Sequence, residues 1–349
     1  MGLMQGLFFC CGFVYNDDSR MTTLEFKETS QSYLGIDFGG TKLLVGEADP
    51  NGKLLASGKY PTGYMDQKQA LRCIQEAVDD YMGKRAQDAP RIAAMGIGVI
   101  GRVDGRGGVW HQIDKQRNEE IPLGRIISSR YGMLCVIDND VRTAASAESA
   151  FGSGKDRKDF IYLNLGTGIA ACIVTGGRVV RGGHFNAGEV GHTQVGVGVE
   201  VRCECGRIDC VEAIAAGAGI DMCARLLAPK YPGTVLRIPE GGGRVDSREV
   251  FSKAETDALC GKLTDNAARG IANLIMNLVR VSDPETVVLG GGLVSDGVLF
   301  SHIQNYLHDH TMRFVTGGVR LIGLEIETVG LLGACSLAMS ADTREDKPI

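Results

Sequence analysis

One pattern, found twice in the sequence, constrains the fold more than any other feature. A buried strand enters a glycine turn, and two further strands follow it. The first copy reads YLGIDFGG, TKLLVGEAD and GKLLASGKY from Tyr33 onward, and the second reads DFIYLNLGTGIAACIVTGGRVVRGG from Asp159 onward. Each copy predicts three antiparallel strands, with Asn51-Gly52 as a hairpin signal in the first. A duplicated unit in a chain of 349 residues predicts two lobes, each with its own core.

The segments that follow these units alternate between helical and strand patterns, which indicates an α/β layer fold. IAAMGIGVI and TVVLGGG are expected to form buried strands. The expected helices occupy residues 67–82, 141–152, 254–280 and 329–340. Residues 228–247 have the Gly and Pro content of a long loop.

The charge of the chain limits its partners. A net charge of −5 supplies no field that would attract nucleic acid or anionic lipid, so we expect neither partner and predict small, specific ligands. LFFCCGFVY, residues 7–15, is too short to span a bilayer. We expect residues 1–30 to be a disordered or non-native extension, with translation beginning at Met21, and the protein to be cytoplasmic; a lipid-anchored N-terminus is the alternative.

The glycine turns are candidate phosphate-binding loops. A turn rich in glycine exposes backbone N–H groups, and a neighbouring carboxylate can hold a hydrated cation. A single such turn is more often an ordinary hairpin, but this chain has two, and a third glycine run follows a strand. Lys42 either adds positive charge near the phosphates or is a solvated strand lysine. The candidate nucleotide-binding residues are Asp37, Gly39, Gly40, Thr41, Lys42, Gly166, Thr167, Gly168, Gly290, Gly291 and Gly292.

A cluster of cysteines with one histidine predicts a metal site. Three thiolates, from Cys203, Cys205 and Cys210, and the imidazole of His192 make a closed tetrahedral set that suits structural zinc. A disulfide is one alternative, but it would leave one thiol unpaired and is disfavoured in the cytosol. Unligated cysteines are the other alternative. The remaining cysteines are scattered along the chain and have the pattern of reduced thiols.

Taken together, these motifs resemble the ROK family of sugar kinases, within the actin, Hsp70 and hexokinase-like ATPase fold. The resemblance covers about residues 33–340 and rests on motifs in the family's order: GIDFGGTK, IDNDVRTAASAE, YLNLGTGIAACIV, GHTQV with CECGRIDC, VVLGGGLVSDG and VGLLGACSLA. It implies two RNase H-like lobes with a structural zinc loop. The smaller lobe would comprise residues 31–139 plus 326–340, the larger lobe residues 140–325, and the tail residues 341–349.

The resemblance also implies residue roles. Asp140 would be the general base, although a carboxylate between a strand and a helix can also be a simple N-cap. Asp37 would orient, through water, the Mg²⁺ that accompanies ATP. Residues expected to contact the sugar are Gly101, Asp114, Asn139, Glu189, His192 and Glu212. A homodimer is also implied.

Two departures from the family pattern bear on the substrate. Ile100 precedes Gly101 where family members commonly have proline, and Asp114 stands at the place of an asparagine or else lies in a solvated loop. We therefore expect ATP-dependent phosphorylation of a hexose or N-acetylhexosamine on a terminal hydroxyl, without a particular sugar. The alternative is a sugar-sensing transcriptional regulator of the same family without a recognisable DNA-binding domain, since the residues before Tyr33 are too few for one. A phosphotransferase acting on acetate or a protein is a third possibility.

Overall fold

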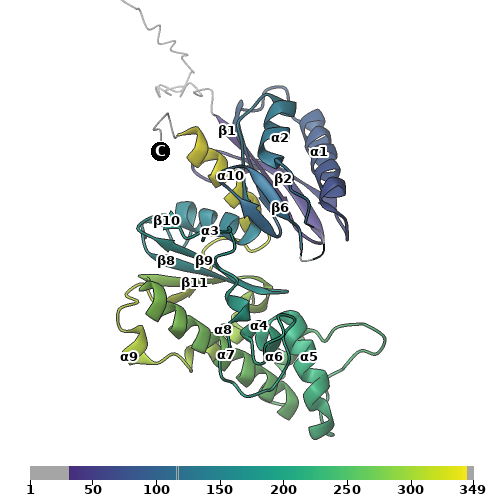
Figure 1. Ribbon diagram of the computed structural model, residues 1–349, viewed down its shortest axis with the longest axis vertical. Helices are drawn as coiled ribbons and strands as arrows, with labels where there is room; N and C mark the ends of the chain where they lie inside the picture. Colours follow the sequence, from purple (N-terminus) through teal and green to yellow (C-terminus); the bar gives the residue numbers. More distant parts are fainter. Residues whose placement is uncertain (1–30, 115, 117, 344–349) are drawn as a thin grey trace, which may run out of the picture.

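The computed structural model describes residues 31–114, 116 and 118–343. It contains two five-stranded mixed sheets built on the same plan (Figure 1). In each sheet the first three strands are antiparallel and two more strands join in parallel. The predicted duplication and the α/β class are confirmed, while the exact boundaries of the two lobes stay predictions.

The first sheet has the strand order β3-β2-β1-β4-β7. Leu34, Ile36 and Phe38 alternate toward one face, where α1 (Gln67–Lys84) and α2 (Leu123–Tyr131) cover them. The strands are β1 (Ser32–Phe38), β2 (Lys42–Ala48), β3 (Leu54–Pro61), β4 (Ile92–Val99) and β7 (Cys135–Asn139). A separate hairpin, β5 (Arg102–Asp104) and β6 (Val109–Gln112), leads from β4 toward α2.

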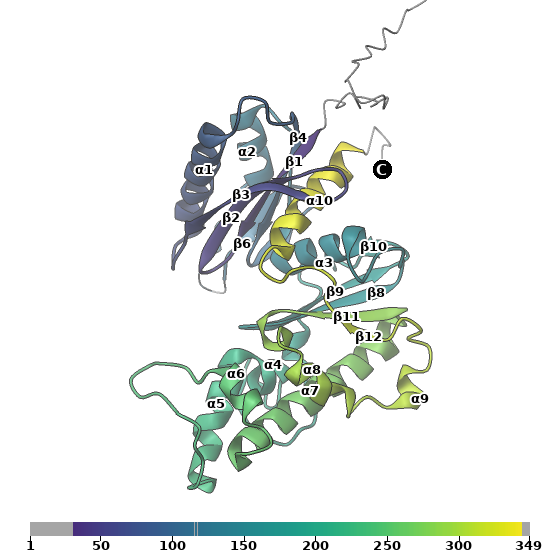
Figure 2. The ribbon, with the colours of Figure 1, turned by 180° about the vertical axis from the view of Figure 1, so that it is seen from behind.

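The second sheet repeats this order as β10-β9-β8-β11-β12. Its strands are β8 (Phe160–Leu165), β9 (Ile169–Thr175), β10 (Arg178–Val179), β11 (Thr286–Gly290) and β12 (Val319–Leu321). The helices beneath it are α4 (Val211–Ala215), α5 (Gly217–Leu227), α6 (Ser247–Ser252), α7 (Ala258–Ser282), α8 (Val298–Gln304) and α9 (Asp309–Met312) (Figure 2). Short 3₁₀ turns are η1 (Val190–His192), η2 (Ala228–Lys230) and η3 (Gly292–Val294).

Two helices, α3 (Asp140–Phe151) and α10 (Val329–Asp342), lie side by side between the sheets (Figures 1 and 2). Their approach is close because glycine occupies the contact: a Cβ on Gly333 would overlap the carbonyl oxygen of Thr143. Gly96 of β4 likewise has no room for a Cβ beside the carbonyl of Ala334. Small residues therefore set the separation of the two sheets.

Helix ends differ from the predicted ones where a capping group decides them. α7 begins at Ala258 rather than at 254, because the Asp257 carboxylate accepts the backbone N–H of Cys260 and ends the preceding turn. α10 continues past residue 340 to Asp342. The predictions for residues 1–30 lie outside the described residues. Among the residues that are described, no helix has the length and apolar character that a membrane span requires.

Candidate active site

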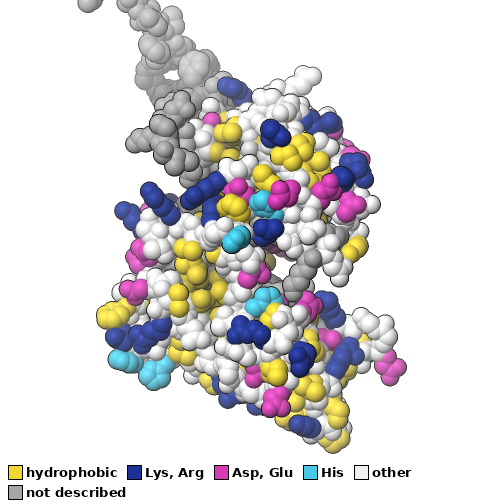
Figure 3. Space-filling view, in the orientation of Figure 1, with side chains coloured by type: hydrophobic (Ala, Val, Ile, Leu, Met, Phe, Trp, Pro, Cys, Tyr) yellow, Lys and Arg dark blue, Asp and Glu magenta, His cyan; other side chains and the backbone are white. Residues whose placement is uncertain are grey.

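One cavity of about 1030 Å³ collects every residue predicted to contact the sugar. Its wall includes residues that follow strands of both sheets and residues of the cysteine loop. The lining contains the six predicted sugar contacts, Gly101, Asp114, Asn139, Glu189, His192 and Glu212, and also the predicted base Asp140. On the face shown in Figure 3, basic and acidic side chains are interspersed rather than gathered by sign. The cavity thus joins distant parts of the chain in one polar site.

Asp140 is placed in this cavity by the junction of β7 and α3. Its side chain is half-buried, and burial raises its pKa to about 7, assisted by the negative charges of Asp37 and Glu189 and opposed by the backbone N–H of Val141. A carboxylate with this pKa can accept a proton near neutral pH, and its conjugate acid can release that proton again. Asp140 therefore has the properties of a general base.

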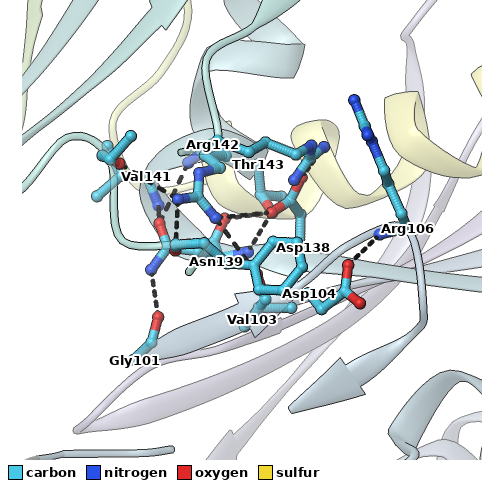
Figure 4. A network of polar contacts seen from close by, with 12 residues as sticks. Gly101, Val103, Asp104, Arg106, Asp138, Asn139, Val141, Arg142 and Thr143 are labelled. Carbon is cyan, nitrogen blue, oxygen red and sulfur yellow. Dashed lines mark hydrogen bonds and ion pairs between the residues drawn. The ribbon is translucent and has the colours of Figure 1, made fainter. Parts of the chain in front are cut away.

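The N-cap of α3 is Asn139, not Asp140. Its Oδ1 accepts the backbone N–H groups of Val141 and Arg142 at 2.9 and 3.4 Å, and its Nδ2 donates to the carbonyl of Gly101 at 2.9 Å (Figure 4). The amide thus ties the Gly101 loop to the start of α3. The N-cap role considered for Asp140 is therefore filled by Asn139. Contact between Asn139 and a sugar stays a prediction.

A buried ion network beside the cavity was missed by the sequence analysis. The side chain of Asp138 is 2% exposed; its Oδ2 lies 2.6 Å from Nη2 of Arg181, and its Oδ1 lies 3.5 Å from Nη1 of Arg142. Arg142 also donates from Nη2 to the carbonyls of Phe185 and Ala187, at 2.8 and 3.2 Å. The sequence signal for this network was Arg142, a charged residue two positions after Asp140 in an otherwise alanine-rich helix.

Glu212 connects the cysteine loop with the second glycine turn. It lies in the first turn of α4, and its Oε2 accepts the backbone N–H of Ile169 at 2.8 Å. Gly168 and Gly191 allow this approach, because a Cβ on either would lie within 2.9 Å of Oε2. The carboxylate therefore has a fixed position in the cavity wall.

The cysteine loop forms a compact donor set that can hold a metal ion. Ligand atoms of His192, Cys203, Cys205 and Cys210 all lie within 4.8 Å of one another. Nδ1 of His192 is 3.4 Å from Sγ of Cys203, and the Sγ atoms of Cys205 and Cys210 are 3.5 Å apart. Three sulfurs and one imidazole at such separations fit tetrahedral zinc, with its ligand bonds of about 2.0–2.3 Å. No disulfide joins the described cysteines.

A second cavity, of about 380 Å³, brings two glycine turns together. Gly166, Thr167 and Gly292 line it, together with residues absent from the prediction: Gly217, Arg244, Ser247 and Arg248 among them. Gly290 and Gly291 are not in the lining of this cavity but make close packing contacts, and their nucleotide role stays a prediction. Tyr162 fills the position of a Cβ at Gly290, and Gly291 has φ +94°. The segment around Arg244 lies in the predicted loop, where the sequence carries no clear nucleotide signal.

The first glycine turn is not part of the lining of either cavity. It is closed by a hydrogen bond from the N–H of Gly39 to the carbonyl of Lys42 at 3.0 Å. Burial raises the pKa of Asp37 to about 6, and the charge of Lys42 opposes this shift. Nζ of Lys42 donates to the carbonyl of Glu327 at 3.2 Å, so the side chain is anchored near the start of α10. The phosphate roles of these residues and of the exposed Gly40 and Thr41 stay predictions.

Asp114 lies both in the wall of the large cavity and in a surface loop. It lines the large cavity, and its Oδ1 accepts the backbone N–H of Gln116 at 2.9 Å, as in a capped surface loop. A local turn therefore holds the Asp114 carboxylate at the cavity wall.

Known proteins match nearly the whole described chain. The sequence model of the ROK family matches residues 33–341. A glucokinase of Thermotoga maritima is 27% identical over 318 residues, which span 87% of this chain and 96% of that protein. The DNA-binding transcriptional dual regulator NagC of Escherichia coli K12 is 25% identical over 311 residues, 88% of this chain and 75% of NagC.

The solved structures include a ROK family glucokinase from Streptomyces griseus in complex with glucose and AMPPNP. It is 26% identical to this chain and superposes with a TM-score of 0.70, over 88% of this chain and 99% of the glucokinase. The predicted actin-like ATPase fold with two lobes is thereby confirmed.

Proposed function

The chain belongs to the ROK family and is a sugar kinase, and we propose that it transfers the γ-phosphoryl group of ATP to the terminal hydroxyl of a hexose or N-acetylhexosamine. The observation that carries this proposal is Asp140, which faces the large cavity with a pKa near 7, beside Glu189 and Glu212. A proton acceptor surrounded by groups that can bind hydroxyls suits an alcohol as the phosphoryl acceptor.

In the proposed reaction, Asp140 accepts the proton of the sugar hydroxyl. The hydroxyl oxygen forms a bond to the γ-phosphorus while the bond from that phosphorus to the β,γ-bridging oxygen breaks, and ADP leaves with the electron pair. Such transfer needs little covalent help from the protein, so rates depend on in-line positioning and on charge stabilisation. Asp140 contributes both proton removal and the direction of attack.

The sugar is held, in this proposal, by Glu189, Glu212 and His192. Glu212 is already fixed by the N–H of Ile169. Nδ1 of His192 faces Cys203, so its Nε2 is the ring nitrogen that can reach a sugar hydroxyl. A zinc ion, when bound, would supply a rigid link among the four ligands. Because Glu189 and Glu212 neighbour two of those ligands in sequence, the same link would set the carboxylate positions.

We propose that the glycine turns bind the nucleotide. Thr167 and Gly292 line the smaller cavity, and their backbone N–H groups suit phosphate and ribose oxygens. Asp37, close enough to raise the pKa of Asp140, is proposed to hold the Mg²⁺ of MgATP through water. Mg²⁺ would neutralise charge that develops on the phosphate oxygens. We also propose that the protein is a homodimer in the cytoplasm.

A panel of hexoses and N-acetylhexosamines with MgATP, in a coupled assay for ADP, tests this function. We expect sugar-dependent ADP release. The 6-deoxy analogue of the best hexose should inhibit without being phosphorylated, because it lacks the accepting hydroxyl. ADP release with the 6-deoxy analogue would refute the terminal position, and no release with any sugar would refute the kinase.

A sugar-sensing regulator is the second candidate, favoured by the similarity to NagC. A regulator needs sugar binding but no proton acceptor, so the raised pKa of Asp140 favours the kinase. A gel-shift assay with genomic fragments, with and without sugar, separates the two. Sugar-dependent binding to a specific sequence would support the regulator.

A further inference from the structure

Phe185 has an unusual backbone conformation for a bulky residue. Its φ is +59°, in the left-handed region that side chains other than those of Asn and Asp rarely adopt. Such a conformation is strained and persists only where its surroundings enforce it. A glycine at this position would avoid the strain. This chain nevertheless has a phenylalanine at a position where the backbone of that residue is strained.

The surroundings that enforce it are the buried ion network. Arg142, 5% exposed, donates to the carbonyl of Phe185 at 2.8 Å and is itself held by Asp138. On the other side, the N–H of Ala187 donates to the carbonyl of Arg181 at 3.2 Å. Figure 4 shows Arg142 and Asp138 beside Asn139, at the start of α3. The Phe185 segment is thus fastened to the same helix turn that carries Asp140.

The ring of Phe185 has a defined place in the cavity. It lines the cavity wall and stacks on the ring of His111, with centroids 5.7 Å apart and planes 12° from parallel. His111 belongs to β6 and is oriented by Glu120, whose Oε1 lies 2.8 Å from Nδ1. Phe185 lines the cavity, and the ring of His111, which is not part of the lining, packs against the Phe185 ring. Fixed rings cannot yield to a larger ligand without losing this stack.

We propose that Phe185, held by Arg142, is a specificity-determining residue that favours unsubstituted hexoses over N-acetylhexosamines. This inference rests on the proposed kinase function and narrows its substrate class. A ring held in the cavity wall limits the room for substituents on a bound sugar, and a 2-acetamido group is larger than a hydroxyl group. The apolar face of the ring also suits the C–H face of a plain sugar ring. Pocket walls of this kind discriminate by about 10-fold to about 200-fold for a single methylene.

Phe185→Gly removes the ring and keeps the backbone, because glycine accepts φ +59° without strain. Asp156→Gly is the matched control: Asp156 has φ +63° and is exposed, in the turn before β8. Phe185→Asn provides a second variant that tolerates the same φ. For each protein, kcat/KM is measured for glucose, mannose and their N-acetylated counterparts, together with the KM for ATP and the melting temperature.

Wild-type protein should prefer the unsubstituted sugars. In Phe185→Gly and Phe185→Asn, the ratio of kcat/KM for N-acetylated to plain sugar should rise at least about tenfold, with the KM for ATP unchanged. Asp156→Gly should leave the ratio at the wild-type value. A wild-type preference for N-acetylhexosamines, or an unchanged or lowered ratio in both Phe185 variants, would overturn the inference while sugar turnover still supported the kinase. Absence of all sugar turnover in wild-type protein would overturn both.

Discussion

Oδ2 of Asp138 lies 2.6 Å from Nη2 of Arg181, which joins the end of β7 in the first sheet to the segment after β10 in the second. The Asp138 side chain is 2% exposed and the Arg181 side chain 20% exposed, so water screens this pair little. Arg142 approaches the other carboxylate oxygen. The pair therefore links the two strand units beside the cavity.

Asp138→Asn should destabilise the protein by about 3 kcal/mol, because it leaves two arginines beside a neutral amide in a buried site. Urea unfolding followed by circular dichroism measures the free energy of unfolding. Asp80→Asn is the control, since Asp80 pairs with Lys84 on the surface and its side chain is 41% exposed. Equal stability of Asp138→Asn and wild type would show that the network is not a structural link.

Asp140→Asn should lower kcat by about 10²-fold to 10⁴-fold while sugar affinity is retained, because the amide keeps the size of the side chain and cannot accept the proton. Steady-state kinetics and a sugar-binding thermal shift measure the two effects. Asp66→Asn, at the N-cap of α1, is a control that keeps its cap and should keep full turnover. Near-normal turnover in Asp140→Asn would eliminate Asp140 as the base.

The pKa of Asp140 predicts two opposite pH dependences. Since the base must be ionised, kcat/KM for the sugar should rise with pH through about 7 and then level off. Stability should show the reverse. A carboxyl group with a pKa raised from 3.8 in the folded state stabilises the fold fully below 3.8, and this stability is lost as pH rises through about 7. Asp140→Asn should therefore be more stable than wild type at pH 8 but not at pH 4. A flat activity profile across neutral pH would contradict the assignment.

Cys205→Ser should remove or weaken zinc and raise the KM for sugar by at least about tenfold, with the KM for ATP unchanged, because the displaced His192 neighbours Glu189 in the sugar site. Metal analysis should find about one zinc per wild-type chain. Cys73→Ser, at a half-buried cysteine outside the cluster, should change neither quantity. Zinc-free Cys205→Ser with wild-type sugar affinity would assign the cluster another purpose.

Asp114→Asn should shift the relative kcat/KM among sugars, because an ionised carboxylate only accepts hydrogen bonds whereas an amide also donates. The local turn should survive, since the amide oxygen can accept the N–H of Gln116 as Oδ1 does. Asp104→Asn is the matched control: Asp104 accepts the N–H of Arg106 in the same way and is not part of the cavity lining. Identical sugar ratios in Asp114→Asn and wild type would place Asp114 outside the substrate contacts.

Features set by neighbouring residues could be predicted from the sequence. Leu34, Ile36 and Phe38 alternate in sequence and in the sheet, because a strand's period is local. The four candidate metal ligands from His192 to Cys210 lie within one short segment, so their spacing alone indicates a metal site. The predicted sugar contacts came from the family resemblance, and the structure brings them into one cavity.

Contacts between distant segments could not be predicted in this way. Arg142 meets the Phe185 carbonyl only because α3 and the segment after β10 are brought together by the two sheets. Local sequence likewise gives no reason for a phenylalanine at φ +59°, where pattern alone favours glycine. The sequence predicts a loop around Arg244, but nothing in that segment indicates that it lies beside the glycine turns.

The glycine contact between α3 and α10 has a mechanical consequence. Because backbone touches backbone at Gly333 and Thr143, with no side chain between them to change rotamer, the two helices cannot slide apart there without losing contact. A rotation of one sheet against the other that kept this contact would have its axis there, so the displacement of each atom would grow with its distance from Gly333.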